Sequence, residues 1–147
     1  TSPTAKLSVN GSANKTGGGS WAVFSDRRLK KDIKPYNDGL QSVLAINPVK
    51  FKYNGISEAN TTTEYVGVIA QELEQVSPYM VNDFELNGKT YLEVDNSAMT
   101  YMLINAVKEL NAEVERLKQE NLEQAEALEA NTAIMKELKT LLNLKTE

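Results

Sequence analysis

The C-terminal part of the chain, from Ser97 to Glu147, contains no proline or glycine, and its apolar residues recur about every 3.5 positions. A heptad register fits it throughout, with Leu103, Leu110, Leu117, Gln124, Asn131 and Leu138 at position d and Val107, Val114, Asn121, Leu128, Met135 and Leu142 at position a. At about 1.5 Å per residue, forty-odd residues of such a helix span roughly 65–70 Å, which is longer than a small domain is wide. We therefore expect it to form a coiled coil with copies of itself. The alternative is a single long helix that folds back on its own domain.

The apolar repeat changes along the helix. Asn121, Gln124 and Asn131 interrupt it in the middle, and polar residues at such positions lower stability but can fix register or strand number. Beyond them the apolar face widens to include Ile134, Met135, Leu138, Leu141, Leu142 and Leu144. A face this wide favours three or more strands, or a helix that bends and packs on another element.

Two residue types are missing from the whole chain, cysteine and histidine. Their absence excludes disulfides, thiolate chemistry, an imidazole base and most kinds of zinc site. A catalytic serine in this chain would need another base, and lysine is the recognised substitute. We expect no metal and no organic cofactor.

The charge balance and the apolar runs limit the classes of partner. With 16 Lys and Arg against 20 Asp and Glu, the net charge is −4, which gives no electrostatic reason to expect nucleic acid or an anionic membrane. The longest apolar runs, such as residues 65–70, are far shorter than the roughly 20 residues that cross a bilayer. We expect a soluble protein.

Composition divides the chain into three segments. Residues 1–24 are rich in Gly, Ser, Thr and Asn and read as a linker or the end of a longer upstream part. Residues 25–96 have the pattern of a small mixed domain, and residues 97–147 form the long helix. The sequence therefore predicts an α+β fold, a small domain of short strands and helices followed by a long C-terminal helix.

The predicted domain is built from short elements. Its patterns predict a helix over 39–46, strands over 49–53 and 65–70, one or two helical turns over 71–76, and a hairpin turn at Asn87-Gly88. Asn-Gly favours the positive φ angles of a two-residue hairpin loop. Asp95, Asn96 or Ser97 is expected to cap the long helix.

A serine and a lysine stand five residues apart in the stretch F-S-D-R-R-L-K-K-D-I, residues 24–33. Serine becomes a good nucleophile when a base removes its proton, and an amine does so only in its neutral form, which nearby cations favour. Five positions put two side chains about 140° apart on a helix and on opposite faces of a strand. A direct bond between Ser25 and Lys30 therefore needs a turn or bulge, or a lysine from a neighbouring chain.

The same stretch also has a purely structural interpretation. In this interpretation Ser25 or Asp26 caps a short charged turn, and the basic residues are solvated or pair with Asp26 and Asp32. Another pair of charges, Glu72 and Glu74, could suggest acid–base chemistry. The two are two positions apart and point away from each other on a helix, which favours a solvated face.

Three motifs occur in order before the heptad repeat. They are S-D-R-R-L-K-K-D-I at 25–33, V-G-V-I-A-Q-E-L-E-Q-V-S-P at 66–78, and L-E-V-D-N-S-A-M-T-Y-M-L-I-N-A-V-K-E-L at 92–110. Together they resemble the C-terminal intramolecular chaperone domain of phage tail spikes and fibres, the endosialidase-type self-cleaving peptidases of family S74. The resemblance is close over residues 25 to about 115.

The resemblance implies a domain that brings three copies of a fibre into register and then cuts itself off. It implies Ser25 as nucleophile, Lys30 as its base in a Ser/Lys dyad, and Phe24–Ser25 as the cleaved bond, with an ester that water hydrolyses. Asp26 and Arg28 also match the motif, and for both we expect structural roles.

The partners implied are two further copies of the chain, in a homotrimer, and the N-terminal fibre or spike passenger, whose end would be residues 1–24. Nucleic acid, membrane and small-molecule substrates are not expected. The resemblance further implies a precursor of a virion tail fibre or spike that is assembled in the cytoplasm of the bacterial host.

Two other functions stay open from the sequence. One is a trimerisation and capping module that keeps the fold and does not cleave. The other is a receptor-binding fibre tip, for which we would expect more exposed aromatic residues than the 10 in this chain.

Overall fold

A computed structural model describes residues 23–143 of the chain. The chain divides between Pro35 and Tyr36 into two units, of which the structure describes residues 23–35 and 36–143. The predicted linker at 1–24 lies outside the described residues except for its last two positions, and so do residues 144–147 of the predicted helix.

The first described unit contains one turn of 3-10 helix, η1 (Arg27–Leu29). The second unit begins with helix α1 (Leu40–Ala45), which confirms the helix predicted at 39–46. Strands β1 (Val49–Phe51) and β2 (Tyr65–Gly67) pair antiparallel, with Lys50 opposite Val66. Both are shorter than predicted, because the chain leaves the sheet after Gly67 to begin the next helix at Ala70.

The next elements form a helix and a hairpin. Helix α2 (Ala70–Val76) is followed by a 3-10 turn, η2 (Pro78–Met80), and by strands β3 (Val81–Leu86) and β4 (Lys89–Val94). The two strands pair antiparallel around Asn87 and Gly88, whose φ angles are 52° and 72°. Asn and Gly adopt positive φ at little cost, so the predicted hairpin turn is confirmed.

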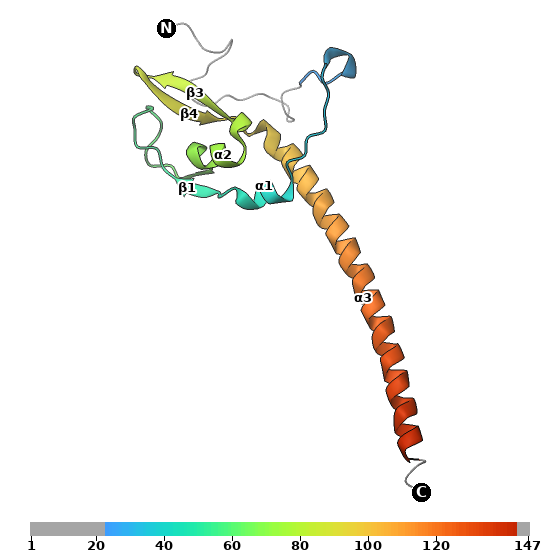
Figure 1. Ribbon diagram of the computed structural model, residues 1–147. Helices are drawn as coiled ribbons and strands as arrows, with labels where there is room; N and C mark the ends of the chain where they lie inside the picture. Colours follow the sequence, from blue (N-terminus) through green and yellow to red (C-terminus); the bar gives the residue numbers. More distant parts are fainter. Residues whose placement is uncertain (1–22, 144–147) are drawn as a thin grey trace, which may run out of the picture. The chain divides into compact units, whose positions relative to one another are not determined.

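A long helix completes the second unit. A 3-10 turn, η3 (Asn96–Ala98), leads into α3 (Met99–Asn143), which is 45 residues long. The Asp95 side chain accepts a hydrogen bond from the Ser97 backbone N–H at 2.9 Å and so caps the entry, as one of the predicted caps. Figure 1 shows α3 leaving the strands and short helices behind and continuing alone.

The core of the second unit lies where α2, η2 and the start of α3 meet. Leu73, Met80 and Met102 form its buried centre. Partly buried residues surround them from the neighbouring elements: Val43, Ile46, Val68, Val81, Val94, Ala98 and Met99. Three fully buried side chains make a small core for a domain of this length. Small domains bury a low fraction of their surface, so we expect this unit to be only marginally stable by itself.

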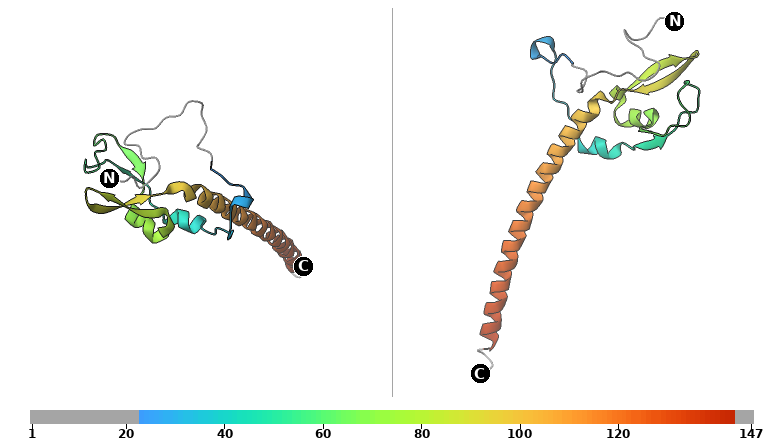
Figure 2. Two further views of the ribbon diagram at one scale, coloured as in Figure 1. Left: turned by 90° about the horizontal axis from the view of Figure 1, so that it is seen from above. Right: turned by 180° about the vertical axis from the view of Figure 1, so that it is seen from behind.

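Helix α1 lies against the first turns of α3, as two further views show (Figure 2). Glu109 of α3 connects the two helices, because its carboxylate accepts a hydrogen bond of 2.8 Å from the Leu40 backbone N–H at the start of α1. Gly39, the residue before α1, has no side chain, and a Cβ at that position would collide with the Glu109 carboxylate. The predicted α+β fold, with short elements followed by a long C-terminal helix, is confirmed.

Candidate functional site

The serine and lysine of the 25–33 motif lie on either side of η1. Asp26 caps this turn by accepting a hydrogen bond from the Arg28 backbone N–H at 2.8 Å. The turn closes with backbone hydrogen bonds from Leu29 to Asp26 and from Lys30 to Arg27. The chain therefore reverses over the four residues between Ser25 and Lys30, which is the turn that a direct bond between them requires.

Ser25 and Lys30 meet across this turn. Lys30 Nζ donates a hydrogen bond to Ser25 Oγ at 2.7 Å. This distance is within the range in which a base can take a serine proton, provided that the amine is neutral. Both side chains are exposed in the described unit.

Asp26 and Arg28 pair with each other within the turn. The Arg28 guanidinium donates from Nε and from Nη2 to the Asp26 carboxylate, with the Nη2 bond at 2.8 Å. The hydrogen bonds from the side chain and the backbone of Arg28 lower the pKa of Asp26 below its ordinary value. Asp26 is therefore an ionised acceptor that fixes the turn, and Ser25 does not take the cap position.

The apolar side chains close to Ser25 and Lys30 in the sequence are exposed in this unit. Phe24 is 92% exposed, Leu29 is 70% exposed, and Ile33 is also exposed.

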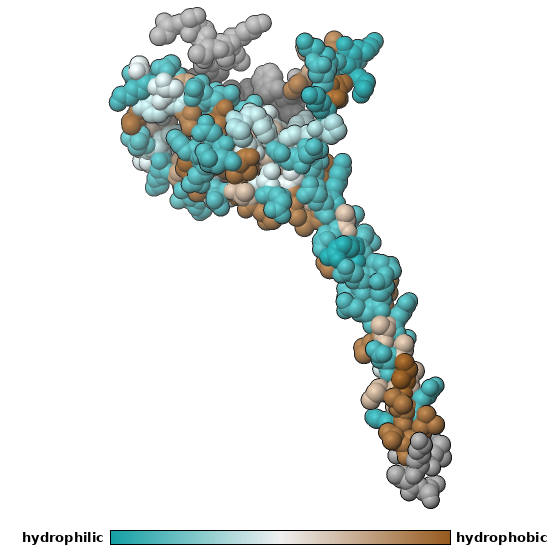
Figure 3. All heavy atoms as spheres, viewed as in Figure 1, coloured by the Kyte–Doolittle hydropathy of each residue, from teal (hydrophilic) through white to brown (hydrophobic). Residues whose placement is uncertain are grey.

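The second candidate feature is the a/d face of α3. Its apolar residues are all exposed in the described chain: Leu103, Val107, Leu110, Val114, Leu117, Leu128, Met135, Leu138 and Leu142. Figure 3 shows apolar side chains gathered over the part of α3 near its C-terminal end. There the exposed residues include Ile134 and Leu141 at position g, which widen the face.

The sequence did not reveal how the chain before α1 attaches to α3. Asn105 Nδ2 donates hydrogen bonds to the backbone oxygens of Tyr36 and Asp38, at 2.8 and 3.0 Å. The Tyr79 hydroxyl donates to Asp38 and lies 2.6 Å from the hydroxyl of Tyr36, which therefore acts as the donor between the two rings. Burial and this bond raise the pKa of Tyr36 well above its usual range. The sequence feature that could have indicated this contact is the position of Asn105, a polar residue inside the apolar run M-L-I-N-A-V.

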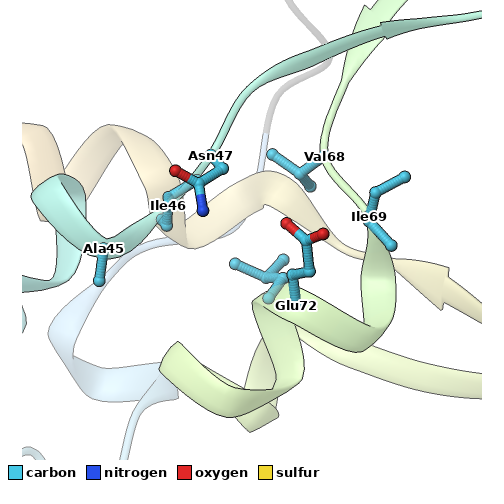
Figure 4. Close-up of a pocket in the computed structure, with 7 residues that line it drawn as sticks. Ala45, Ile46, Asn47, Val68, Ile69 and Glu72 are labelled. Carbon is cyan, nitrogen blue, oxygen red and sulfur yellow. The ribbon is translucent and has the colours of Figure 1, made fainter.

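Two cavities of the second unit lie beside its short helices and strands. A small pocket between α1 and α2 is lined by Asn47, Val68 and Glu72, among others (Figure 4), and its volume of about 10 Å³ suits one water molecule. A wider groove of about 560 Å³ is lined by residues of both strand pairs, β1–β2 and β3–β4, among them Phe51, Gly67 and Phe84. Glu72 is exposed, which agrees with a solvated face and not with a buried acid.

Within residues 23–143, no cluster of acidic side chains is arranged to hold a metal ion. None of the helices described is both long and apolar enough to cross a membrane.

Comparison with known proteins places the motif at 25–33 in a family. Residues 25–82 match the family model described as chaperone of endosialidase, which belongs to the S74 peptidases. This segment belongs to the chaperone-of-endosialidase family. The match begins at Ser25, the first residue of the candidate dyad, and it confirms the family that the three motifs indicated.

The curated relatives of this chain are phage proteins. The long tail fiber protein Gp37 of Enterobacteria phage M1 is 34% identical over 98 residues, which cover 65% of this chain and 39% of the relative. The same values hold for the protein of Enterobacteria phage Ox2. The Gp37 protein of Salmonella phage S16 is 29% identical over 122 residues, or 78% of this chain and 16% of the relative. The chain thus spans about two fifths or less of the length of these relatives.

Proposed function

We propose that this chain is the intramolecular chaperone of a phage tail fibre, which assembles three copies through α3 and then releases itself by cutting the Phe24–Ser25 bond. Its relatives are long tail fiber proteins, and its segment 25–82 belongs to the chaperone-of-endosialidase family. The observation on which the proposal depends is the 2.7 Å hydrogen bond between Lys30 Nζ and Ser25 Oγ at the start of that segment.

Trimerisation is supported by the face that α3 leaves open. The a/d residues of α3 repeat at coiled-coil spacing and are exposed, while the buried core of the second unit is small. Covering these side chains with copies of the same helix would supply the apolar burial that the single chain lacks. The added g residues Ile134 and Leu141 widen the face beyond a two-stranded seam, which favours three strands.

The proposed reaction uses the chain itself as substrate. Lys30 Nζ takes the proton from Ser25 Oγ, and the oxygen attacks the carbonyl carbon of Phe24. The C–N bond between Phe24 and Ser25 breaks as Lys30 returns the proton to the departing amine, which leaves an ester between the two residues. Water then hydrolyses the ester and restores the serine hydroxyl. Because nucleophile and carbonyl are neighbours in the chain, proximity supplies much of the rate.

Assembly would prepare this dyad for reaction. An amine in contact with water favours its charged form, which donates to the serine and cannot accept its proton. Burial of Phe24, Leu29 and Ile33 against another surface in the assembled protein would exclude water from the dyad. Cleavage would then follow assembly and would occur once in each chain.

In this proposal residues 1–24 are the end of the fibre passenger, 25–96 form the peptidase and chaperone domain, and 97–147 form the trimerisation helix. The passenger lies on the N-terminal side of the cut. The precursor would be assembled in the host cytoplasm, and the released fibre would become part of the virion tail.

Intact mass spectrometry of freshly expressed chain tests the proposal. Wild type is expected to yield a product that begins at Ser25, and Ser25→Ala and Lys30→Ala are expected to stay whole. Lys31→Ala, which removes the adjacent lysine, is the matched control and should be cleaved like wild type. Assembled wild-type chains that stay whole would show a trimerisation module without peptidase activity.

A further inference from the structure

The chain that leaves the dyad passes from exposed to partly buried within a few residues. Every residue from Val23 to Asn37 is exposed, and Asp38 is the first that is partly buried. The boundary between the two units, after Pro35, falls at almost the same place. The segment 36–38 is therefore where this chain becomes part of the second unit.

Two elements of the second unit hold this segment, and we call their contacts the 36–38 clamp. On one side Asn105 of α3 donates from Nδ2 to the backbone oxygens of Tyr36 and Asp38, at 2.8 and 3.0 Å. On the other side the Tyr79 hydroxyl of η2 donates to the Asp38 carboxylate at 2.5 Å and accepts from the Tyr36 hydroxyl at 2.6 Å. One amide thus fixes the backbone at two points, and one hydroxyl fixes the two side chains.

Both clamp residues have a fixed place in the folded unit. Asn105 directly precedes Ala106, and Tyr79 directly precedes Met80. Ala106 and Met80 are 4% and 1% exposed, so each clamp residue is joined to a buried neighbour. The groups that hold the segment are therefore positioned by the packing of the second unit.

The clamp determines how long a chain joins the dyad to the second unit. Five residues, 31–35, connect Lys30 to Tyr36, so the Cα atoms of these two residues are at most about 22 Å apart. If the clamp opens, the next hydrogen bond to α3 along the chain is the one between the Leu40 N–H and Glu109. Nine residues, 31–39, then form the tether, and the limit rises to about 36 Å.

We infer that Asn105 is a positioning residue for the proposed cleavage, because it keeps the dyad on a short tether to the helix through which copies assemble. The proposed reaction needs the dyad to reach a surface of the assembled protein that excludes water from Lys30. The effective concentration of a tethered group falls with about the 3/2 power of tether length, or more steeply. Opening the clamp should therefore make this encounter about twofold rarer or more. The inference rests on the proposed function.

A change in tether length tests the inference without altering any contact of the clamp. Gly-Ser-Gly-Ser inserted between Pro35 and Tyr36 lengthens the tether by four residues. The clamp itself is opened by Asn105→Ala combined with Tyr79→Phe, which removes the donors on both sides. Each full chain is made by cell-free translation, and intact mass gives the rate at which the product beginning at Ser25 appears after synthesis stops. Native gels give the trimer fraction, so that the rate is expressed per assembled chain.

Both the insertion and the clamp variant are expected to slow cleavage per assembled chain at least about twofold. The matched control is Glu109→Ala, one turn further along α3. It also removes a hydrogen bond to the chain before α1, but its partner Leu40 lies beyond the clamp. Glu109→Ala should weaken the fold and leave the rate per assembled chain unchanged. A purely structural role for Asn105 predicts the same unchanged rate for the clamp variant.

A wild-type rate per assembled chain in either the insertion or the clamp variant would overturn the inference. Glu109→Ala that is slowed as much as the clamp variant would also overturn it, because loss of stability would then explain both. The insertion decides alone if the clamp variant does not fold. Wild-type trimers whose Phe24–Ser25 bond stays whole would overturn the proposed function, and this inference with it.

Discussion

The first turns of α3 and the rest of the helix differ in what covers them. Between Met99 and Glu109 the helix packs on its own domain, where Met102 and Ala106 are buried and Glu109 caps α1. From Val107 to Leu142 every side chain is exposed. One continuous helix is therefore part of a domain core at its start and an uncovered surface along most of its length.

The two regions also use different faces of the helix. Met99, Met102, Ala106 and Glu109 occupy positions g and c, and this face closes on the domain. The neighbouring a/d face, which begins with Leu103, stays open even where the helix touches the domain. Met102 is 1% exposed and Leu103 is 52% exposed, although they are adjacent in the sequence. The domain thus covers one side of α3 and leaves the heptad side exposed.

The largest effect is expected from a charge placed in the open face. Leu117→Asp should abolish assembly, because the bundle would bury unpaired carboxylates in one layer, at a cost above about 4 kcal/mol. Sedimentation velocity should show monomers. Ala112→Asp, at position f on the opposite side of the helix, is the control and should assemble normally. Normal assembly of Leu117→Asp would show that the exposed a/d face of α3 is not the surface through which copies associate.

Adjacent truncations should separate the two faces. Met102→Ala removes a buried side chain from the domain core and should lower the free energy of unfolding by about 2–5 kcal/mol. Leu103→Ala should instead weaken association, because its side chain is outside that core. The measurements are denaturant unfolding and the concentration dependence of assembly for both variants. Equal effects of the two variants on both quantities would show that the faces are not distinct.

A smaller effect is expected where α3 holds α1. Glu109→Ala removes the acceptor of the Leu40 N–H, and loss of such a cap costs about 1 kcal/mol. Gly39→Ala should act in the same direction, because its methyl group would displace the Glu109 carboxylate. Glu126→Ala, on the exposed part of the helix, should change stability by less than about 0.5 kcal/mol. Thermal unfolding of the three variants measures these effects. An unchanged melting temperature in Glu109→Ala would show that its hydrogen bond to Leu40 does not stabilise the domain.

The smallest effect concerns the entry to α3 and depends on pH. Hydrogen bonds from Ser97 lower the pKa of Asp95 below its ordinary value of 3.8. A carboxylate with a lowered folded-state pKa stabilises the fold above the unfolded value and loses that contribution as the pH falls through the folded value. The difference in melting temperature between wild type and Asp95→Asn should therefore shrink as the pH falls below about 4. A melting-temperature difference that stays constant as the pH falls below about 4 would show that the charged Asp95 side chain does not stabilise the start of α3.

The sequence predicted those parts of the fold that depend on local chemistry. Asn87-Gly88 specifies its turn through positive φ, and the apolar period of α3 specifies a helix. The use of the g/c face by the domain and the hydrogen bonds from Asn105 could not be predicted, because they depend on how distant segments meet. The contact between Ser25 and Lys30 lies between these cases. Five residues of spacing do not imply it, and the turn capped by Asp26 creates it.

In the proposed function, assembly through α3 makes the Ser25–Lys30 pair reactive. The most direct test measures, over a dilution series of freshly folded wild-type chain, the fraction of trimer by sedimentation and the fraction of chains that begin at Ser25 by intact mass. We expect cleaved chains to appear only where trimers form, and the two fractions to rise together with concentration. Cleavage at the same rate in monomers, or trimers whose Phe24–Ser25 bond stays whole, would contradict this expectation.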